Sequence, residues 1–99
     1  MTRDIQTVNF NADQTLIDFV NERITKLHQY FDGIVAIEAY LKLDNNSEED
    51  NKIAEIRVFI PGNDLFAKKK GKTFEEAIDQ VLDSVKRQVQ KHKEKIKGL

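Results

Sequence analysis

Basic side chains gather near the carboxyl end of this chain. Residues 86–97 contain one acid, Glu94, against six bases: Lys86, Arg87, Lys91, Lys93, Lys95 and Lys97. The 99-residue chain as a whole is nearly neutral, with 16 Lys and Arg against 17 Asp and Glu. Because a polyanion contact needs local rather than net charge, this segment is a candidate phosphate-binding surface. The plainer alternative is a Lys-rich helix that is simply solvated.

The spacing of these bases predicts two rows on one helix. At about 100° per residue, the rows flank an apolar stripe. They are Arg87, Lys91 and Lys95 on one side, and Lys86, Lys93 and Lys97 on the other. Four more lysines end the preceding strand and lead into the helix: Lys68, Lys69, Lys70 and Lys72. We therefore expect one basic region, built from a strand end and a helix, that suits the phosphates of folded RNA.

Catalytic and metal-binding patterns are missing from the sequence. The chain has no Cys, and its two histidines, His28 and His92, fall on different predicted helices. Ser47 and Ser84 lie outside any nucleophile elbow, and the glycines form no phosphate loop. The acids at 48–50 lack the spacing of a calcium loop. We expect a protein without catalytic residues, metal or cofactor.

Hydrophobic periodicity predicts the elements that position the bases. Strands are expected at 4–10, 35–43, about 54–60 and 65–70. Two helical stripes are expected: Leu16, Val20, Ile24, Leu27 and Phe31, and then Phe74, Ala77, Ile78, Val81, Val85, Val89, His92 and Ile96. Asp13 and Thr73 are predicted N-caps, the latter in a capping box with Glu76. Gly33 is predicted to end the first helix in a left-handed conformation, and 61–64 to form a hairpin turn.

The order β-α-β-β-β-α predicts an α+β fold, a four-stranded sheet with two helices packed on one face. The open face would show Tyr40, Lys42, Arg57, Phe59, Phe66, Lys68 and Lys70. Its aromatic rings could stack on bases, but ordinary cross-strand pairing is favoured because no RNP-like motif is present. We expect one domain over 1–99, with a helix end that projects beyond the sheet and frays at about 93–99. No signal region or membrane span is visible, so the expected location is the cytoplasm.

Several segments together resemble the ribosome hibernation-promoting factors, also called ribosome-associated translation inhibitors or protein Y. The similar segments are Thr15 to Val20, Leu27 to Asp32, Leu41-Lys42-Leu43, Ala54 to Gly62, Phe74 to Asp79 and Arg87 to Lys93. They run in order over nearly the whole chain. Because this chain ends at Leu99, it is similar to the short members or to the N-terminal domain of a long one.

The resemblance implies a fold similar in its latter part to double-stranded-RNA-binding domains. It implies binding in the decoding groove of the small ribosomal subunit and its rRNA, which leaves ribosomes intact but idle in starvation or stationary phase. It implies RNA contacts at Lys42, Arg87, Lys91, His92 and Lys93, beside the bases already named. We expect a monomer off the ribosome, with no DNA or membrane partner.

Two other functions stay open at this point. One is a protein–protein regulatory module, which the family's older naming as sigma-factor modulators suggests. The other is a general binder of structured RNA. Strong salt dependence of binding to ribosomal particles would favour ribosome binding, and preference for small subunits over naked duplex would exclude the general RNA binder.

Overall fold

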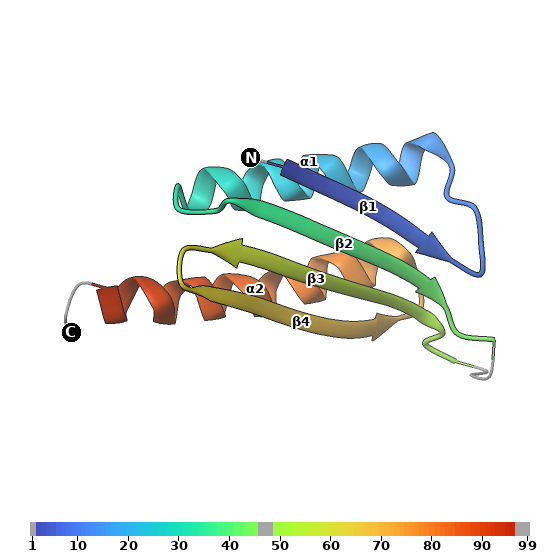
Figure 1. The fold of residues 1–99 in the computed structure, drawn as a ribbon. Helices are drawn as coiled ribbons and strands as arrows, with labels where there is room; N and C mark the ends of the chain where they lie inside the picture. Colours follow the sequence, from blue (N-terminus) through green and yellow to red (C-terminus); the bar gives the residue numbers. More distant parts are fainter. Residues whose placement is uncertain (1, 46–48, 97–99) are drawn as a thin grey trace.

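Four strands and two helices form the chain in the computed structural model, which describes residues 2–45 and 49–96 (Figure 1). Their bounds are β1 Thr2–Val8, α1 Gln14–Tyr30, β2 Ala36–Leu43, β3 Lys52–Ile60, β4 Asn63–Gly71 and α2 Phe74–Ile96. The strands lie in the order β1-β2-β3-β4, with β1 parallel to β2 and the other neighbours antiparallel. The predicted order of elements is confirmed.

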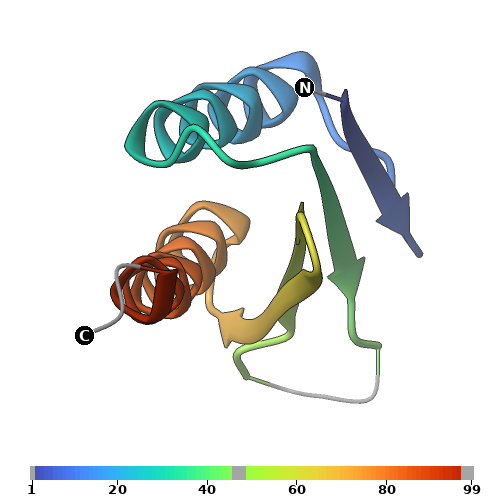
Figure 2. The same ribbon diagram turned by 60° about the vertical axis from the view of Figure 1, so that its left-hand side comes forward.

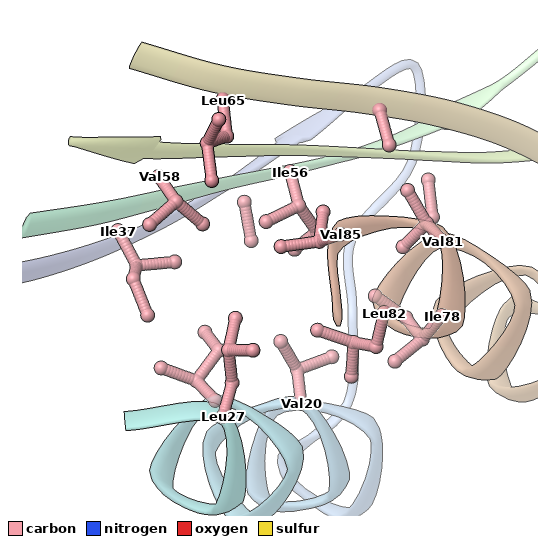
Figure 3. Close-up of a cluster of buried hydrophobic side chains, with 14 of the residues drawn as sticks. Val20, Leu27, Ile37, Ile56, Val58, Leu65, Ile78, Val81, Leu82 and Val85 are labelled. Atoms are coloured by element: carbon pink, nitrogen blue, oxygen red, sulfur yellow. The ribbon is translucent and has the colours of Figure 1, made fainter. Parts of the chain in front are cut away.

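Both helices lie on the same side of the sheet, which confirms the predicted α+β architecture (Figure 2). Apolar side chains from the inner face of the sheet meet apolar side chains of α1 and α2 in one core (Figure 3). Core residues labelled there include Val20, Leu27, Ile37, Ile56, Val58, Ile78 and Val85. Within the described parts of the chain, no element covers the other face. The alternating strands therefore give the sheet one buried and one open face.

Both predicted helix starts are confirmed. The backbone N–H of Leu16 donates to the Asp13 carboxylate at 2.9 Å, so Asp13 caps α1. At α2, the N–H of Glu76 donates to the Thr73 hydroxyl at 3.0 Å, which is one half of the predicted capping box. These bonds satisfy amide groups that have no partner inside a helix. The caps therefore set where each helix begins and which face it turns to the sheet.

The end of α1 differs from the prediction. Phe31 has an extended conformation with φ −144°, and its N–H donates to the Leu27 carbonyl. Gly33 does not adopt the left-handed conformation, so its prediction as a left-handed C-cap is wrong. A Cβ atom at Gly33 would lie 2.8 Å from Cζ of Phe31. The glycine therefore makes room for the Phe31 ring instead of supplying a special backbone angle.

The bounds of two strands and one buried position of α2 also differ from the prediction. The first strand covers 2–8 instead of 4–10, and Phe10 beyond it stacks on Phe74 with ring centroids 4.4 Å apart. The strand predicted over 35–43 begins one residue later, at Ala36, so that Val35 is 57% exposed and Ile34 is buried. Leu82, missing from the predicted stripe of α2, is buried.

A tight hairpin and a long helix set the shape of the carboxyl half. Ile60 pairs with Asn63, so the β3–β4 turn consists of Pro61 and Gly62. Gly62 has φ +78°, which a residue with a side chain adopts only under strain. After β4, α2 runs back along the sheet and beyond the ends of the strands (Figure 1). Among its described side chains the last buried one is Val89, and the helix continues to Ile96.

Candidate nucleic-acid interface

The predicted basic residues fall into two groups by the elements that carry them. Lys42, Lys68, Lys70 and Lys72 lie where β2 ends and β4 leads into α2; we call them the sheet-end cluster. Lys86, Arg87, Lys91, His92, Lys93 and Lys95 lie along the second half of α2; we call them the helix-end cluster. At 1.5 Å per residue, Lys91 is about 25 Å along the helix from its first residue, Phe74. Because α2 runs back along β4, Lys91 lies away from the end of β4, whereas Gln88 of the same helix contacts Phe66, two residues before Lys68. The expected single basic region stays a prediction.

Acidic side chains are interleaved with the sheet-end cluster. The Lys42 ammonium is 2.8 Å from the Glu55 carboxylate, and the Lys70 ammonium is 3.6 Å from that of Asp44. Lys68 pairs across the strands with Glu55. Lys72 lines a shallow hollow together with Glu49 and Asp50. Much of the positive charge at this end is thus balanced by nearby carboxylates, which lowers its attraction for phosphate.

The open face of the sheet is a charge-balanced surface with a shallow depression. Its lining holds two acids, two bases and two aromatic rings: Glu38, Glu55, Lys42, Arg57, Tyr40 and Phe66. The Arg57 guanidinium lies over the Phe66 ring, 5.6 Å from its centroid, on the neighbouring strand. Burial, and then a hydrogen bond donated to Glu38, raise the pKa of the Tyr40 hydroxyl above its usual value. The Arg57–Phe66 contact is a cross-strand pair of the kind favoured over base stacking, whereas the Tyr40–Glu38 bond lies within β2.

One flank of the helix-end cluster faces β4 and solvent. Arg87 is 74% exposed on its side chain and forms an ion pair with Asp83 one turn earlier. Lys91 lines a groove between α2 and the β3–β4 hairpin, beside Asn63. Gln88 holds this groove together, because its amide donates to the Phe66 carbonyl at 2.8 Å. Arg87 and Lys91 are therefore exposed bases on a helix that is fixed to the sheet.

The other flank of the helix-end cluster faces α1. The ammonium groups of Lys86 and Lys93 lie 5.9 Å and 5.0 Å from the centroid of the Tyr30 ring. The Tyr30 hydroxyl donates to the Gln90 side chain at 2.8 Å. The two predicted rows of bases are thus found on opposite flanks of α2, one towards the hairpin and one towards α1.

His92 packs where the apolar stripe runs out. It is half-buried, and its ring meets Phe31 edge-on, with centroids 6.1 Å apart. On the outer surface, the Arg23 guanidinium of α1 donates to Asp79 of α2 at 2.9 Å. That hydrogen bond raises the pKa of Arg23, so the link between the helices stays charged. The Arg23–Asp79 bond thus links the two helices in the first half of α2, whereas His92 beyond Val89 contacts Phe31, the residue that follows α1.

Some predicted residues lie outside the described part of the structure. The side chains of Lys95 and Ile96 are not described, nor is Lys97, Ser47 or Glu48. The predicted fraying of about 93–99 extends into residues 97–99, which are not described either, and stays a prediction. Among the residues that the structure does describe, no three His, Asp or Glu side chains gather as a metal site would require. In the same residues, neither helix is long and apolar enough to cross a membrane.

A four-stranded sheet with two helices on one face and exposed bases along the second helix defines an α+β protein suited to binding a polyanion. The family model described as "Sigma 54 modulation protein / S30EA ribosomal protein" matches residues 4–97. The chain belongs to this family, which confirms the family predicted from the sequence.

Curated relatives and solved structures agree with this assignment. The chain is similar to the "Ribosome hibernation promoting factor" of Klebsiella oxytoca, with 32% identity over 98% of each chain. That of Escherichia coli K12 is 31% identical over the same shares. A ribosomal subunit interface protein from Coxiella burnetii has the same fold, with TM-score 0.83, 16% identity and coverage of 94% of this chain and 98% of that one. The N-terminal domain of Thermus thermophilus Protein Y follows at TM-score 0.76, 24% identity and coverage of 90% and 94%.

Tyr30 is the residue of this surface that sequence analysis did not select as part of the site. It lies three residues after Leu27 and was read only as part of a family-like segment. Its contact with Lys86 and Lys93 depends on how α1 and α2 approach each other. The ion pair of Lys42 with Glu55 depends in the same way on how neighbouring strands pair.

Proposed function

We propose that this chain binds the small ribosomal subunit through rRNA phosphates and inhibits translation. It would occupy the decoding groove, where messenger and transfer RNA otherwise bind, and keep ribosomes idle in stationary phase or starvation. Family membership and relatives named as ribosome hibernation promoting factors support ribosome association and translation inhibition. Such a protein would act in the cytoplasm, by steric exclusion and without catalysis.

The observation that carries the proposal is the difference between the two basic clusters. Carboxylates neutralise Lys42 and Lys70 in the sheet-end cluster. In the helix-end cluster, the ion pair found among described side chains is that of Arg87 with Asp83, on the solvent side. Exposed pairs of this kind are worth about 0–1 kcal/mol, so a phosphate can replace the Asp83 carboxylate. The helix-end cluster is thus the stronger candidate for phosphate contact.

Binding to purified small ribosomal subunits tests the proposal. The dissociation constant should rise steeply with salt, with a slope in log–log form of roughly 0.7–0.9 for each phosphate contacted. Subunits preloaded with messenger and initiator transfer RNA should bind the protein much more weakly than empty ones. Simultaneous binding of all three would contradict occupancy of the decoding groove. Binding that survives high salt and nuclease would instead favour a protein–protein regulatory module, and equal affinity for naked duplex a general RNA binder.

The sheet-end cluster gives a weaker test. Replacing Lys68 and Lys70 by Gln should lower the salt slope of subunit binding by about one to two, if both contact phosphate. Stability should change little, because both side chains are exposed and the ion pair of Lys70 is solvent-accessible. Binding isotherms at several salt concentrations, with a melting curve for each variant, measure both quantities. An unchanged slope removes these two lysines from the contact surface.

A further inference from the structure

Tyr30 brings two lysines of another helix together. Tyr30 is the last residue of α1, and its ring lies beside three residues on one face of α2: Lys86, Gln90 and Lys93. The hydroxyl is anchored on Gln90, between the two lysines in sequence, so the ring cannot swing freely away from either. Tyr30 is nevertheless 40% exposed, and this surface is accessible to a ligand.

Lys86 lines a hollow with Asp79 and Asp83, but neither Lys86 nor Lys93 forms an ion pair with a described acid. Among the described side chains, no carboxylate lies within ion-pair distance of Lys86 or Lys93, whereas Lys42, Lys70 and Arg87 each have one. An ammonium group near an aromatic ring keeps its full charge, and it can still donate hydrogen bonds on the side away from the ring. Both lysines are therefore held in place while remaining able to bind a phosphate.

We propose that Tyr30 is a positioning residue that preorganises Lys86 and Lys93 as a phosphate-binding pair on the α1 side of α2. This inference rests on the proposed function and deepens it. Arg87 and Lys91 lie on the other flank of α2, towards β4 and solvent. The second half of α2 would then contact phosphodiester groups of structured RNA on both of its flanks.

Preorganisation explains why a tyrosine would matter without contacting RNA itself. A free lysine loses side-chain freedom when it binds a phosphate, and that loss weakens binding. A ring that already holds the ammonium removes part of the loss before the RNA arrives. The benefit requires the aromatic face and not the hydroxyl, because the cation interacts with the ring.

Variants at Tyr30 test this inference with small ribosomal subunits as the probe and the full chain as the ligand. Tyr30→Leu should weaken binding by about threefold to tenfold, because Lys86 and Lys93 would then lose more side-chain freedom on binding. Tyr30→Phe keeps the ring and should bind within about twofold of the unchanged protein. Lys86→Gln with Lys93→Gln should weaken binding and lower the salt slope by about two.

The decisive measurement is a double-mutant cycle. Adding Tyr30→Leu to the Lys86→Gln and Lys93→Gln variant should cause no further loss, because no lysine is left to position. Adding Tyr30→Leu to Arg87→Gln should cause its full loss, because that residue lies away from the ring. Melting curves show whether the variants with and without Tyr30→Leu are equally stable. A Tyr30→Leu effect that persists without the lysines, or no effect in the unchanged protein, overturns the inference. If the unchanged protein does not bind small subunits, the proposed function itself fails, and the two failures are thereby distinguished.

Discussion

Replacing Arg87 and Lys91 by Glu is expected to abolish inhibition of translation while the protein stays folded. Loss of two phosphate contacts should lower the salt slope of subunit binding by about two, and the new carboxylates add repulsion from RNA. The fold should tolerate the change because both side chains are exposed. Arg87→Glu removes the ion pair with Asp83 and places a like charge one turn away from it. Each of these two changes costs about 0.2–0.5 kcal/mol of stability. In vitro translation and melting temperature measure the two outcomes.

The sheet-end cluster provides a control with the same change in charge. Lys68→Glu with Lys70→Glu also replaces two bases by two acids, but at the end of the molecule where carboxylates are already interleaved. We expect this variant to inhibit translation with reduced potency. If the variant with Arg87→Glu and Lys91→Glu inhibits as well as the unchanged protein at equal stability, the RNA contact lies elsewhere. Equal loss in both variants would point to an effect of net charge alone.

Leu27→Ala is expected to destabilise the protein by about 2–5 kcal/mol, the range for removing a large buried side chain. Leu27 is fully buried between α1 and the sheet (Figure 3). A domain of this size has a free energy of unfolding of about 5–15 kcal/mol, so the loss is a large fraction of the total. Urea unfolding of the variant and the unchanged protein measures the difference. Gln29→Ala, an exposed position two residues later, should stay within about 0.5 kcal/mol. A loss below about 1 kcal/mol for Leu27→Ala would contradict the packing of α1 on the sheet.

The interior of each element could be predicted from the sequence because its pattern is local. Alternation placed Ile37 and Leu41 inward, and the helical stripe placed Val81 and Val85 in the core. The ends of elements could not be predicted as well. Gly33 resembles a left-handed C-cap by residue type, but the packing of the Phe31 ring decides the geometry there. Val35 continues an alternating pattern, yet the strand begins one residue later.

The candidate site was predictable as a set of residues and not as a surface. Charge clustering selected the bases of α2, and helical spacing correctly divided them between two flanks. The sequence could not tell that β4 and α2 run in opposite directions at their junction, which places Lys70 far from Lys91. It also could not tell which charges are neutralised, because Lys42 and Glu55 are 13 positions apart and meet only through strand pairing.

Because the buried core ends before α2 does, the stability of the fold and the charge of the exposed surface depend on different parts of this helix. Val89 is the last buried residue among the described side chains of that helix, and Lys91, His92 and Lys93 follow it. Substitutions at the exposed Lys91 can therefore change how strongly the proposed surface attracts RNA and leave the free energy of unfolding nearly constant. Under the proposed function, mutations at such exposed positions could raise or lower the affinity for the ribosome without a compensating mutation in the core.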